Sequence, residues 1–204
     1  MSDSRYTEYR RHVEERFTRM RPTSDSASVH TSPSGKYTLE IVEYTEGPQS
    51  WNYSRGTVRQ NDSGELIADV KRNLGNFWFC WVLRSDGEYL LCGEDYQGYN
   101  IIDLAGKQTV LTFPPEAYEG GGFCWVSVHP SPSGSLLAVE GCYWGGSNEL
   151  VIYDFSNPTR SPLRELFRVD YLADAGSWQS DFEFTYSEGE DEPYQQRSWV
   201  KENQ

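Results

Sequence analysis

The chain has 204 residues, a formal net charge of −13 at neutral pH, and aromatic side chains at 15% of its positions. This length suits one domain with a core of its own, and the abundance of aromatic residues argues against disorder over most of the chain. The negative charge disfavours nucleic acid and anionic lipid as partners, because both are negatively charged themselves. A basic protein or a cation is the class of partner that such a field favours.

The charge is distributed unevenly along the chain. Residues 1–22 hold six Arg against four acidic residues, whereas residues 181–204 hold seven acidic residues against two basic ones. The acidic and polar composition of residues 187–204 predicts a flexible tail. The body between the two ends is strongly acidic, and it is this body that we expect to meet a basic partner.

Cysteine usage and hydropathy bear on location. The four cysteines lie within apolar strand patterns and lack the close C-x-x-C spacing of a zinc site: Cys80, Cys92, Cys124 and Cys142. We interpret them as buried free thiols in a reducing compartment. No stretch has the length and apolar character of a signal sequence or a membrane span. The sequence therefore predicts a cytoplasmic protein without a bound cofactor or metal.

Residues 3–20 carry the pattern of one amphipathic helix. Apolar side chains recur at spacings of three and four residues, at Tyr6, Tyr9, Val13, Phe17 and Met20. Pro22 then ends the helix, and a short polar linker at 23–26 follows it. Two interpretations of this N-terminal segment, 1–22, stay open: a helix packed on the body through its apolar stripe, or a detachable arm that binds a partner.

An internal repeat dominates the rest of the chain. The segment SVHTSPSG at 28–35 returns as SVHPSPSG at 127–134, and FCWV at 79–82 returns at 123–126. The FCWV segment at 79–82 runs into a turn of its own, RSDG at 84–87. Three copies of one unit therefore start near residues 26, 77 and 123, and a period of about 45–50 residues is typical of blade arrays.

Each unit reads as four short strands joined by turns that contain Gly, Pro, Asn or Asp, the pattern of an antiparallel meander. The expected strands are 26–30, 37–44, 53–59 and 66–71; 77–83, 89–92, 99–104 and 109–113; and 123–128, 136–140, 149–155 and 163–169. Alternating Phe, Tyr and polar residues predict one more strand within 178–186. The fold class expected is all-β, with three four-stranded antiparallel blade-like units over 23–186 and one N-terminal helix.

The chain resembles a WD40-like or TolB-type β-propeller. The resemblance rests on SPSGKY at 32–37, SDGEYL at 85–90 and SPSGSL at 131–136, and on the third-strand endings IIDL at 101–104 and VIYDF at 151–155. The Gly-His pair and the Trp-Asp dipeptide of standard WD40 repeats are missing. The resemblance implies a scaffold for binding more often than an enzyme, and a fold by itself does not give a function.

The number of units raises a question of closure. Closed propellers use four to eight blades, whereas three units and one further strand leave open sheet edges. Two chains could complete one ring, or the sheets could close on each other while the helix and the last strand cover the ends. We expect a compact monomer with capped ends in preference to a ring-completing homodimer.

Candidate binding residues come from the loops between the second and third strands of each unit, which a meander places at one end. These loops, 43–52, 93–98 and 141–148, combine acidic and aromatic residues with glycine, the composition of a hot-spot surface. The predicted binding residues are Glu43, Tyr44, Trp51, Glu94, Asp95, Tyr96, Tyr99, Glu140, Tyr143 and Trp144. The loops between units add Arg72, Asn76, Glu116, Tyr118 and Glu119 at the same end. The alternative is that the rings fold inward as lids on the core.

Catalytic chemistry has little support in the sequence. His30 and His129 occupy equivalent repeat positions, and we expect a structural role in which the imidazole bonds backbone groups of the neighbouring turn. Glu94 and Asp95 are adjacent, and adjacent strand residues point to opposite sides. The function expected is a non-enzymatic protein-binding module, an inhibitor or immunity-type protein that captures a basic partner. The alternative is a propeller that binds or hydrolyses a small ligand or carbohydrate.

Overall fold

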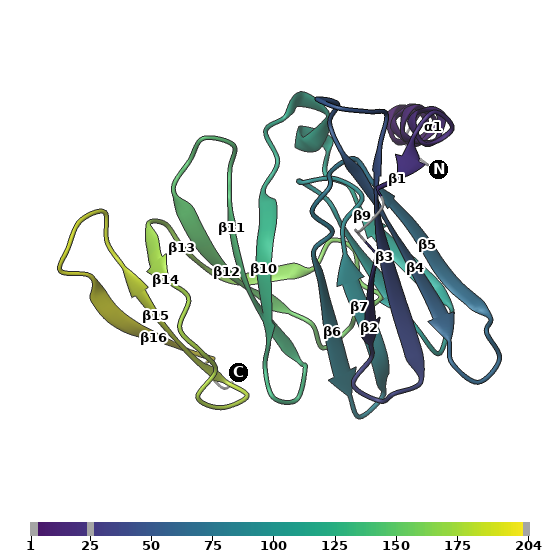
Figure 1. Cartoon of the computed structure of the whole chain (residues 1–204). Coiled ribbons are helices and arrows are strands. Elements are labelled where there is room, and N and C mark those ends of the chain that lie inside the picture. Colours follow the sequence, from purple (N-terminus) through teal and green to yellow (C-terminus); the bar gives the residue numbers. More distant parts are fainter. Residues whose placement is uncertain (1–3, 24–26, 202–204) are drawn as a thin grey trace.

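The computed structural model describes residues 4–23 and 27–201. Four antiparallel sheets stand side by side in chain order, like the blades of an open propeller (Figure 1). The predicted all-β fold class is confirmed, and each of the three predicted units is a separate sheet.

The first sheet contains the first predicted unit and one additional short strand. Its strands are β1 (Arg21–Pro22), β2 (Ser28–Thr31), β3 (Tyr37–Thr45), β4 (Tyr53–Gln60) and β5 (Leu66–Arg72). β3, β4 and β5 form a meander, and both β1 and β2 pair with β3. Residues 24–26, which hold most of the predicted linker and the start of the first predicted strand, lie outside the described residues.

The second and third sheets follow the predicted meanders closely. The second consists of β6 (Phe79–Arg84), β7 (Gly87–Cys92), β8 (Tyr99–Asp103) and β9 (Gln108–Thr112). The third consists of β10 (Cys124–Pro130), β11 (Leu136–Cys142), β12 (Asn148–Asp154) and β13 (Arg164–Val169). A one-turn helix, η1 (Pro115–Glu119), lies in the connection between the two sheets.

The C-terminal region differs from the prediction of one strand and a flexible tail. β14 (Leu172–Asp174), β15 (Glu183–Glu188) and β16 (Gln195–Val200) form a fourth sheet, in which β16 pairs with β15 from Glu183–Val200 to Glu188–Gln195. Trp178, placed in the predicted strand, makes only an isolated bridge with Phe184. Phe184 and Tyr186 of β15 are buried against the third sheet.

The core consists of three apolar layers, one between each pair of neighbouring sheets. Successive strand residues point to opposite faces, so Leu90 packs toward the first sheet and Leu91 toward the third. In the third sheet, Val151 likewise faces the second sheet and Leu150 the fourth. The inner strands of these two sheets are therefore apolar on both faces, as strands buried on both sides must be.

The repeated S-P-S-G segment forms the same turn twice. The Ser32 N–H donates to the Tyr37 carbonyl and the Ser131 N–H to the Leu136 carbonyl, both at 2.9 Å. Gly35 and Gly134 end these turns at φ values of 73° and 69°, in the left-handed region that favours glycine.

The following sheet holds each S-P-S-G turn in place. The backbone N–H of Ser34 donates to Glu88 of the second sheet at 3.0 Å. The backbone N–H of Ser133 donates to Asp181, just before β15, at 2.5 Å. In both turns a carboxylate from the next sheet therefore accepts a hydrogen bond from the same position of the repeat, which helps to fix the spacing of the sheets.

Helix α1 (Ser4–Phe17) begins the described chain and lies across one end of the first two sheets (Figure 1). The predicted apolar stripe faces the body, where Val13 is buried. The Phe17 ring packs edge-on against Tyr44 at 5.1 Å and Tyr53 at 5.8 Å between ring centres. In this structure the helix is packed on the body, and it ends three residues earlier than predicted.

The loop end of the sheets as candidate binding site

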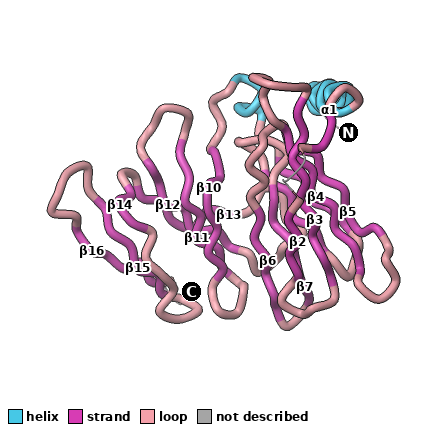
Figure 2. The backbone as a smooth tube through the Cα atoms, viewed as in Figure 1, coloured by secondary structure: helices cyan, strands magenta, loops and turns pink. Residues whose placement is uncertain are grey.

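The loops predicted to form a binding surface do lie at one end of the sheets, which we call the loop end. It consists of the β3–β4, β7–β8 and β11–β12 loops together with η1. The tight turns β2–β3, β6–β7 and β10–β11 lie at the opposite end (Figures 1 and 2). α1 covers the loop end of the first sheet and, around Glu94, part of that of the second.

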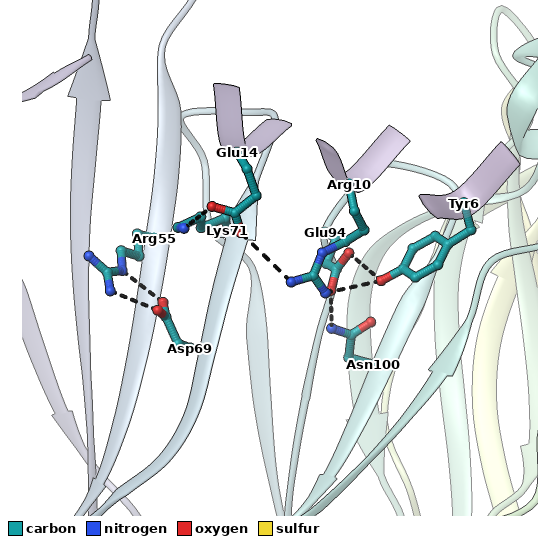
Figure 3. Close-up of polar contacts among 8 residues, drawn as sticks. All are labelled: Tyr6, Arg10, Glu14, Arg55, Asp69, Lys71, Glu94 and Asn100. Atoms are coloured by element: carbon teal, nitrogen blue, oxygen red, sulfur yellow. Dashed lines mark hydrogen bonds and ion pairs between the residues drawn. The ribbon is translucent and has the colours of Figure 1, made fainter. Parts of the chain in front are cut away.

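Glu94, in the β7–β8 loop, is the anchor of α1. Its carboxylate accepts hydrogen bonds from the Tyr6 hydroxyl at 2.8 Å and from Arg10 Nη1 at 3.0 Å, both on the helix (Figure 3). Asn100 Nδ2 donates to the same carboxylate at 3.4 Å, and the Tyr9 hydroxyl donates to the Glu94 carbonyl at 2.9 Å. Only 6% of Glu94 is exposed, so this predicted binding residue is covered by α1.

Basic and acidic groups alternate along the rest of this contact. Lys71 of β5 pairs with Glu14 of the helix (Figure 3). Arg16 and Arg19 approach the two oxygens of Glu46, in the β3–β4 loop, at 3.2 Å and 3.3 Å. Arg10, Arg16 and Arg19 are therefore paired with acidic residues of the loop end, whereas Glu14 is paired with a basic residue of β5.

The backbone of the β7–β8 loop is fixed by Arg72, which is almost fully buried. Its Nη1 donates to the carbonyls of Gly93 and Asp95 at 2.8 Å and 2.5 Å, and its Nε donates to the Asn76 carbonyl at 2.9 Å. Burial lowers the pKa of Arg72, and the neighbouring Asp95 opposes that shift. Asp95 also accepts a hydrogen bond from Asn73, so the loop is held on both sides.

The predicted aromatic residues divide into lids and exposed rings. Tyr99 is buried in the core, with its ring stacked on Trp125 at 4.3 Å, and Tyr44 packs against Phe17 of the helix. The side chains of Trp51, Tyr143 and Trp144 are exposed by 61%, 42% and 67%. Tyr99 and Tyr44 are therefore covered rings, whereas Trp51, Tyr143 and Trp144 are open to solvent.

Three aromatic residues of the β7–β8 and β11–β12 loops lie on the part of the loop end that α1 leaves open. Trp144 lies 5.2 Å from Tyr96 between ring centres, so the β7–β8 and β11–β12 loops meet there. Tyr143, beside Trp144, packs against Phe123 at 5.4 Å. We call Tyr96, Tyr143 and Trp144 the aromatic patch. Trp51 lies in the β3–β4 loop of the first sheet and is not counted in the patch. Its Nε1 donates to the Asn73 carbonyl at 2.9 Å.

Two predicted acidic residues have roles outside the patch. Glu43 lies half-buried at the end of β3, where its carbonyl accepts the Thr23 N–H at 2.9 Å. Glu140 lies in β11 and accepts a hydrogen bond from His129 Nε2 at 2.5 Å. This contact of Glu140 is with β10, on the side of β11 away from β12.

A cleft of about 350 Å³ opens beside the patch, between the second and third sheets. Its walls include five aromatic rings, three charged side chains and Gln97: Tyr99, Phe123, Trp125, Tyr143, Tyr153, Glu116, Glu165 and Arg168. The sequence did not predict this cleft, because its rings come from two different units that no local pattern relates. The segments FCWV at 123–126 and VIYDF at 151–155 supply three of these rings, and this is the signal that could have found it.

The two repeat histidines are structural, but their partners differ from the prediction. His30 Nε2 bonds the Ser28 hydroxyl at 3.0 Å and His129 Nε2 bonds the Ser127 hydroxyl at 2.9 Å, where turn backbone was expected. Glu140 contacts the same nitrogen of His129. A catalytic triad needs its carboxylate and its nucleophile on opposite nitrogens of the ring, so Ser127, His129 and Glu140 do not form one.

The cysteines are free thiols. Burial raises the pKa of Cys80 to about 12 and that of Cys124 to about 11, so both remain protonated and unreactive at neutral pH. Among residues 4–23 and 27–201, no group of three His, Cys, Asp or Glu side chains is placed to hold a metal ion. The same residues contain no helix of the length and apolar character that crossing a membrane requires.

Comparison with known proteins finds similarity to a viral protein in sequence and to a propeller domain in structure. The chain is 34% identical over 169 residues to an uncharacterised protein of Acanthamoeba polyphaga mimivirus, across 77% of this chain and 65% of that protein. It therefore spans about two thirds of the length of this relative. No protein-family model matches the chain.

Among the similar solved structures is the β-propeller domain of Cps50 (Swd1) from Myceliophteria thermophila. It is 14% identical to this chain, the match covers 89% of this chain and 52% of that one, and the TM-score is 0.47. The propeller-like description of the fold rests on the four sheets themselves.

Proposed function

We propose that the chain is a non-enzymatic protein-binding module that captures a basic partner on the aromatic patch. The observation that carries the proposal is the exposure of Tyr143 and Trp144 next to Tyr96, on an acidic molecule. Large rings that are exposed together on a protein surface commonly mark an interaction site.

Helix α1 supports the proposal, because it is a basic segment that the loop end of the same molecule already binds. It is rich in Arg and Tyr, and it is bound by acidic and aromatic residues of the loop end through Glu94, Glu46 and Tyr44. A basic segment of another protein would find related chemistry on the open part of this end. The form of the function that we favour is an inhibitor or immunity-type protein of the cytoplasm, where four free thiols stay reduced.

The test uses two exposed aromatic residues at opposite ends of the molecule. Trp144→Ala removes a ring of the patch, whereas Phe182→Ala removes a ring that is 52% exposed before β15. We expect Trp144→Ala to weaken binding of a partner captured from the source organism by about 30-fold or more, as a hot-spot ring does. Phe182→Ala should leave the affinity unchanged, as isothermal titration calorimetry would measure.

Thermal unfolding of the same variants separates binding from folding. If Trp144 were a lid on the core, Trp144→Ala would cost about 3–5 kcal/mol of stability and lower the melting temperature. That result, with partner affinity intact, would contradict the proposal. Turnover in a panel of glycans and other small substrates, abolished by Asp95→Asn or Glu140→Gln, would support the enzymatic alternative.

A further inference from the structure

The cleft beside the aromatic patch has an ordered aromatic wall. Tyr99 of β8, Trp125 of β10 and Tyr153 of β12 form a continuous stack, with ring centres 4.3 Å and 5.3 Å apart. Tyr143 belongs both to the patch and to the lining of the cleft, so a partner docked on the patch lies at the opening of the cleft. The wall is set before any ligand arrives, because each of the three stacked rings is buried.

Two polar groups of the cleft have no partner within the described residues. Tyr153 is 8% exposed, and its hydroxyl, which makes no hydrogen bond to another described residue, is free to pair with a ligand in the cleft. Burial, with the nearby Glu165 carboxylate, raises the pKa of Tyr153, so the phenol stays neutral. Glu116, on η1 at the cleft's rim, is exposed, and its carboxylate forms no hydrogen bond or ion pair with the described residues.

Arg168 shows which chemistry the remaining wall accepts. Its guanidinium carbon lies 4.9 Å from the Phe123 ring centre and 5.8 Å from that of Tyr143. Two of its nitrogens bond the two oxygens of Glu165 at 3.0 Å and 2.7 Å, and Glu149 binds it as well. Glu165 and Glu149 together offset the positive charge of Arg168. The carboxylate of Glu116 therefore gives the lining of the cleft a net negative charge.

We propose that this cleft receives an arginine side chain of the basic partner, with Glu116 pairing the guanidinium and the Tyr153 oxygen accepting one of its N–H groups. This inference rests on the proposed function, because the arginine side chain belongs to the protein partner proposed there. Arginine fits better than lysine, since its planar group can lie over a ring and donate several hydrogen bonds at once. An anion is disfavoured by the Glu116 and Glu165 carboxylates.

The direct test titrates the full chain with N-acetyl-arginine amide and follows the indole N–H resonances by NMR. The probe's neutral isostere, N-acetyl-citrulline amide, serves as the control ligand. We expect the Trp125 indole resonance, assigned with Trp125→Phe, to shift with the arginine compound and to stay in place with citrulline. Equal shifts with both compounds, or no shift of this resonance at millimolar concentrations, would overturn the inference.

Matched variants identify the residues. Glu116→Gln should weaken binding of the arginine compound about two- to fivefold, as expected for an exposed ion pair. Glu119→Gln changes the same charge on the same short helix, is equally exposed and lies outside the cleft lining, so it should have no effect. Tyr153→Phe keeps the buried ring and should cost about three- to tenfold. Equal effects of the two Glu variants would point to the general field of the protein and refute the site.

The two proposals fail in different ways. If partner binding is lost in Trp144→Ala but is unchanged in Glu116→Gln and Tyr153→Phe, the partner uses the patch without filling the cleft, and only the arginine site is refuted. If the arginine compound binds the cleft while no partner depends on Trp144, the arginine site stands and the patch is refuted as the docking surface.

Discussion

Glu94 is the charged residue on which the arrangement of the loop end depends. It is nearly buried, and its carboxylate accepts hydrogen bonds from Tyr6, Arg10 and Asn100. Burial raises the pKa of Glu94 above its ordinary value, and Arg10 and Tyr6 only partly offset that effect. The contact between helix and loop is therefore sensitive to pH.

Replacing this carboxylate should remove that sensitivity. Because the pKa of Glu94 is raised on folding, its stabilising contribution is complete below its ordinary value of 4.5 and is lost as pH rises through the folded-state value. The unfolding free energy of wild type minus that of Glu94→Gln should therefore decrease as pH is raised toward neutrality. Urea unfolding across this pH range measures it, with Glu119→Gln as an exposed control. A difference that grows with pH would contradict the assignment.

At the scale of elements, the close approach of neighbouring strands is concentrated at a few glycines. Gly141 of β11 pairs with Trp125 of β10, and a Cβ at position 141 would lie 2.3 Å from the Cys124 carbonyl oxygen and 2.5 Å from the Phe123 ring. Phe123 directly precedes β10 and Tyr143 directly follows β11. The wall of the cleft therefore depends on the absence of a side chain at 141.

Gly141→Ala should destabilise the protein by about 1–3 kcal/mol, the cost of overpacking a close-packed interior. Gly121→Ala is the matched control, because a Cβ there would meet nothing nearer than 3.8 Å. Differential scanning calorimetry compares the two variants. Equal melting temperatures would mean that β10 and β11 can separate without cost.

Local pattern predicted most elements, and where it failed the reason lies in the residues. β11 and β12 were predicted because their apolar runs, LLAV at 136–139 and LVIY at 150–153, are separated by a loop that contains Gly and Asn. β16, whose sequence is QQRSWV, was missed because Trp199 is the main apolar anchor among polar residues. The burial of Glu94 was missed because its partners on α1 are more than 80 residues away in the chain, a distance that no local pattern spans.

For the whole molecule, the outer faces of the first and fourth sheets decide whether two chains can associate. On β3, Leu39 is buried against the second sheet, so Thr38 and Glu40 point to the outside. On the same sheet, Arg55 and Asp69 form a two-bond ion pair at 2.7 Å (Figure 3). At the other end, Thr185 alternates with the buried Phe184 and Tyr186. Both outer faces are therefore mainly polar, with Val29 and Val200 as exposed apolar residues among these side chains.

These polar faces favour a monomer over a ring completed by two chains, because a blade-to-blade interface within this molecule is apolar. We expect sedimentation equilibrium to give the mass of one chain, 23.5 kDa, at micromolar concentrations. A stable dimer that is disrupted by a charge reversal at Arg55, and unaffected by one at Arg197, would refute this expectation.

The central claim is that the open part of the loop end binds a protein partner, and hydrogen exchange of the complex tests it most directly. With the captured partner bound, amide exchange should slow in residues 93–98 and 143–147, the loops that carry Tyr96, Tyr143 and Trp144. Exchange in β15 and β16 should stay as it is in the free chain. Slowed exchange on the outer face of the first sheet or in β14–β16, with both loops unchanged, would contradict the claim.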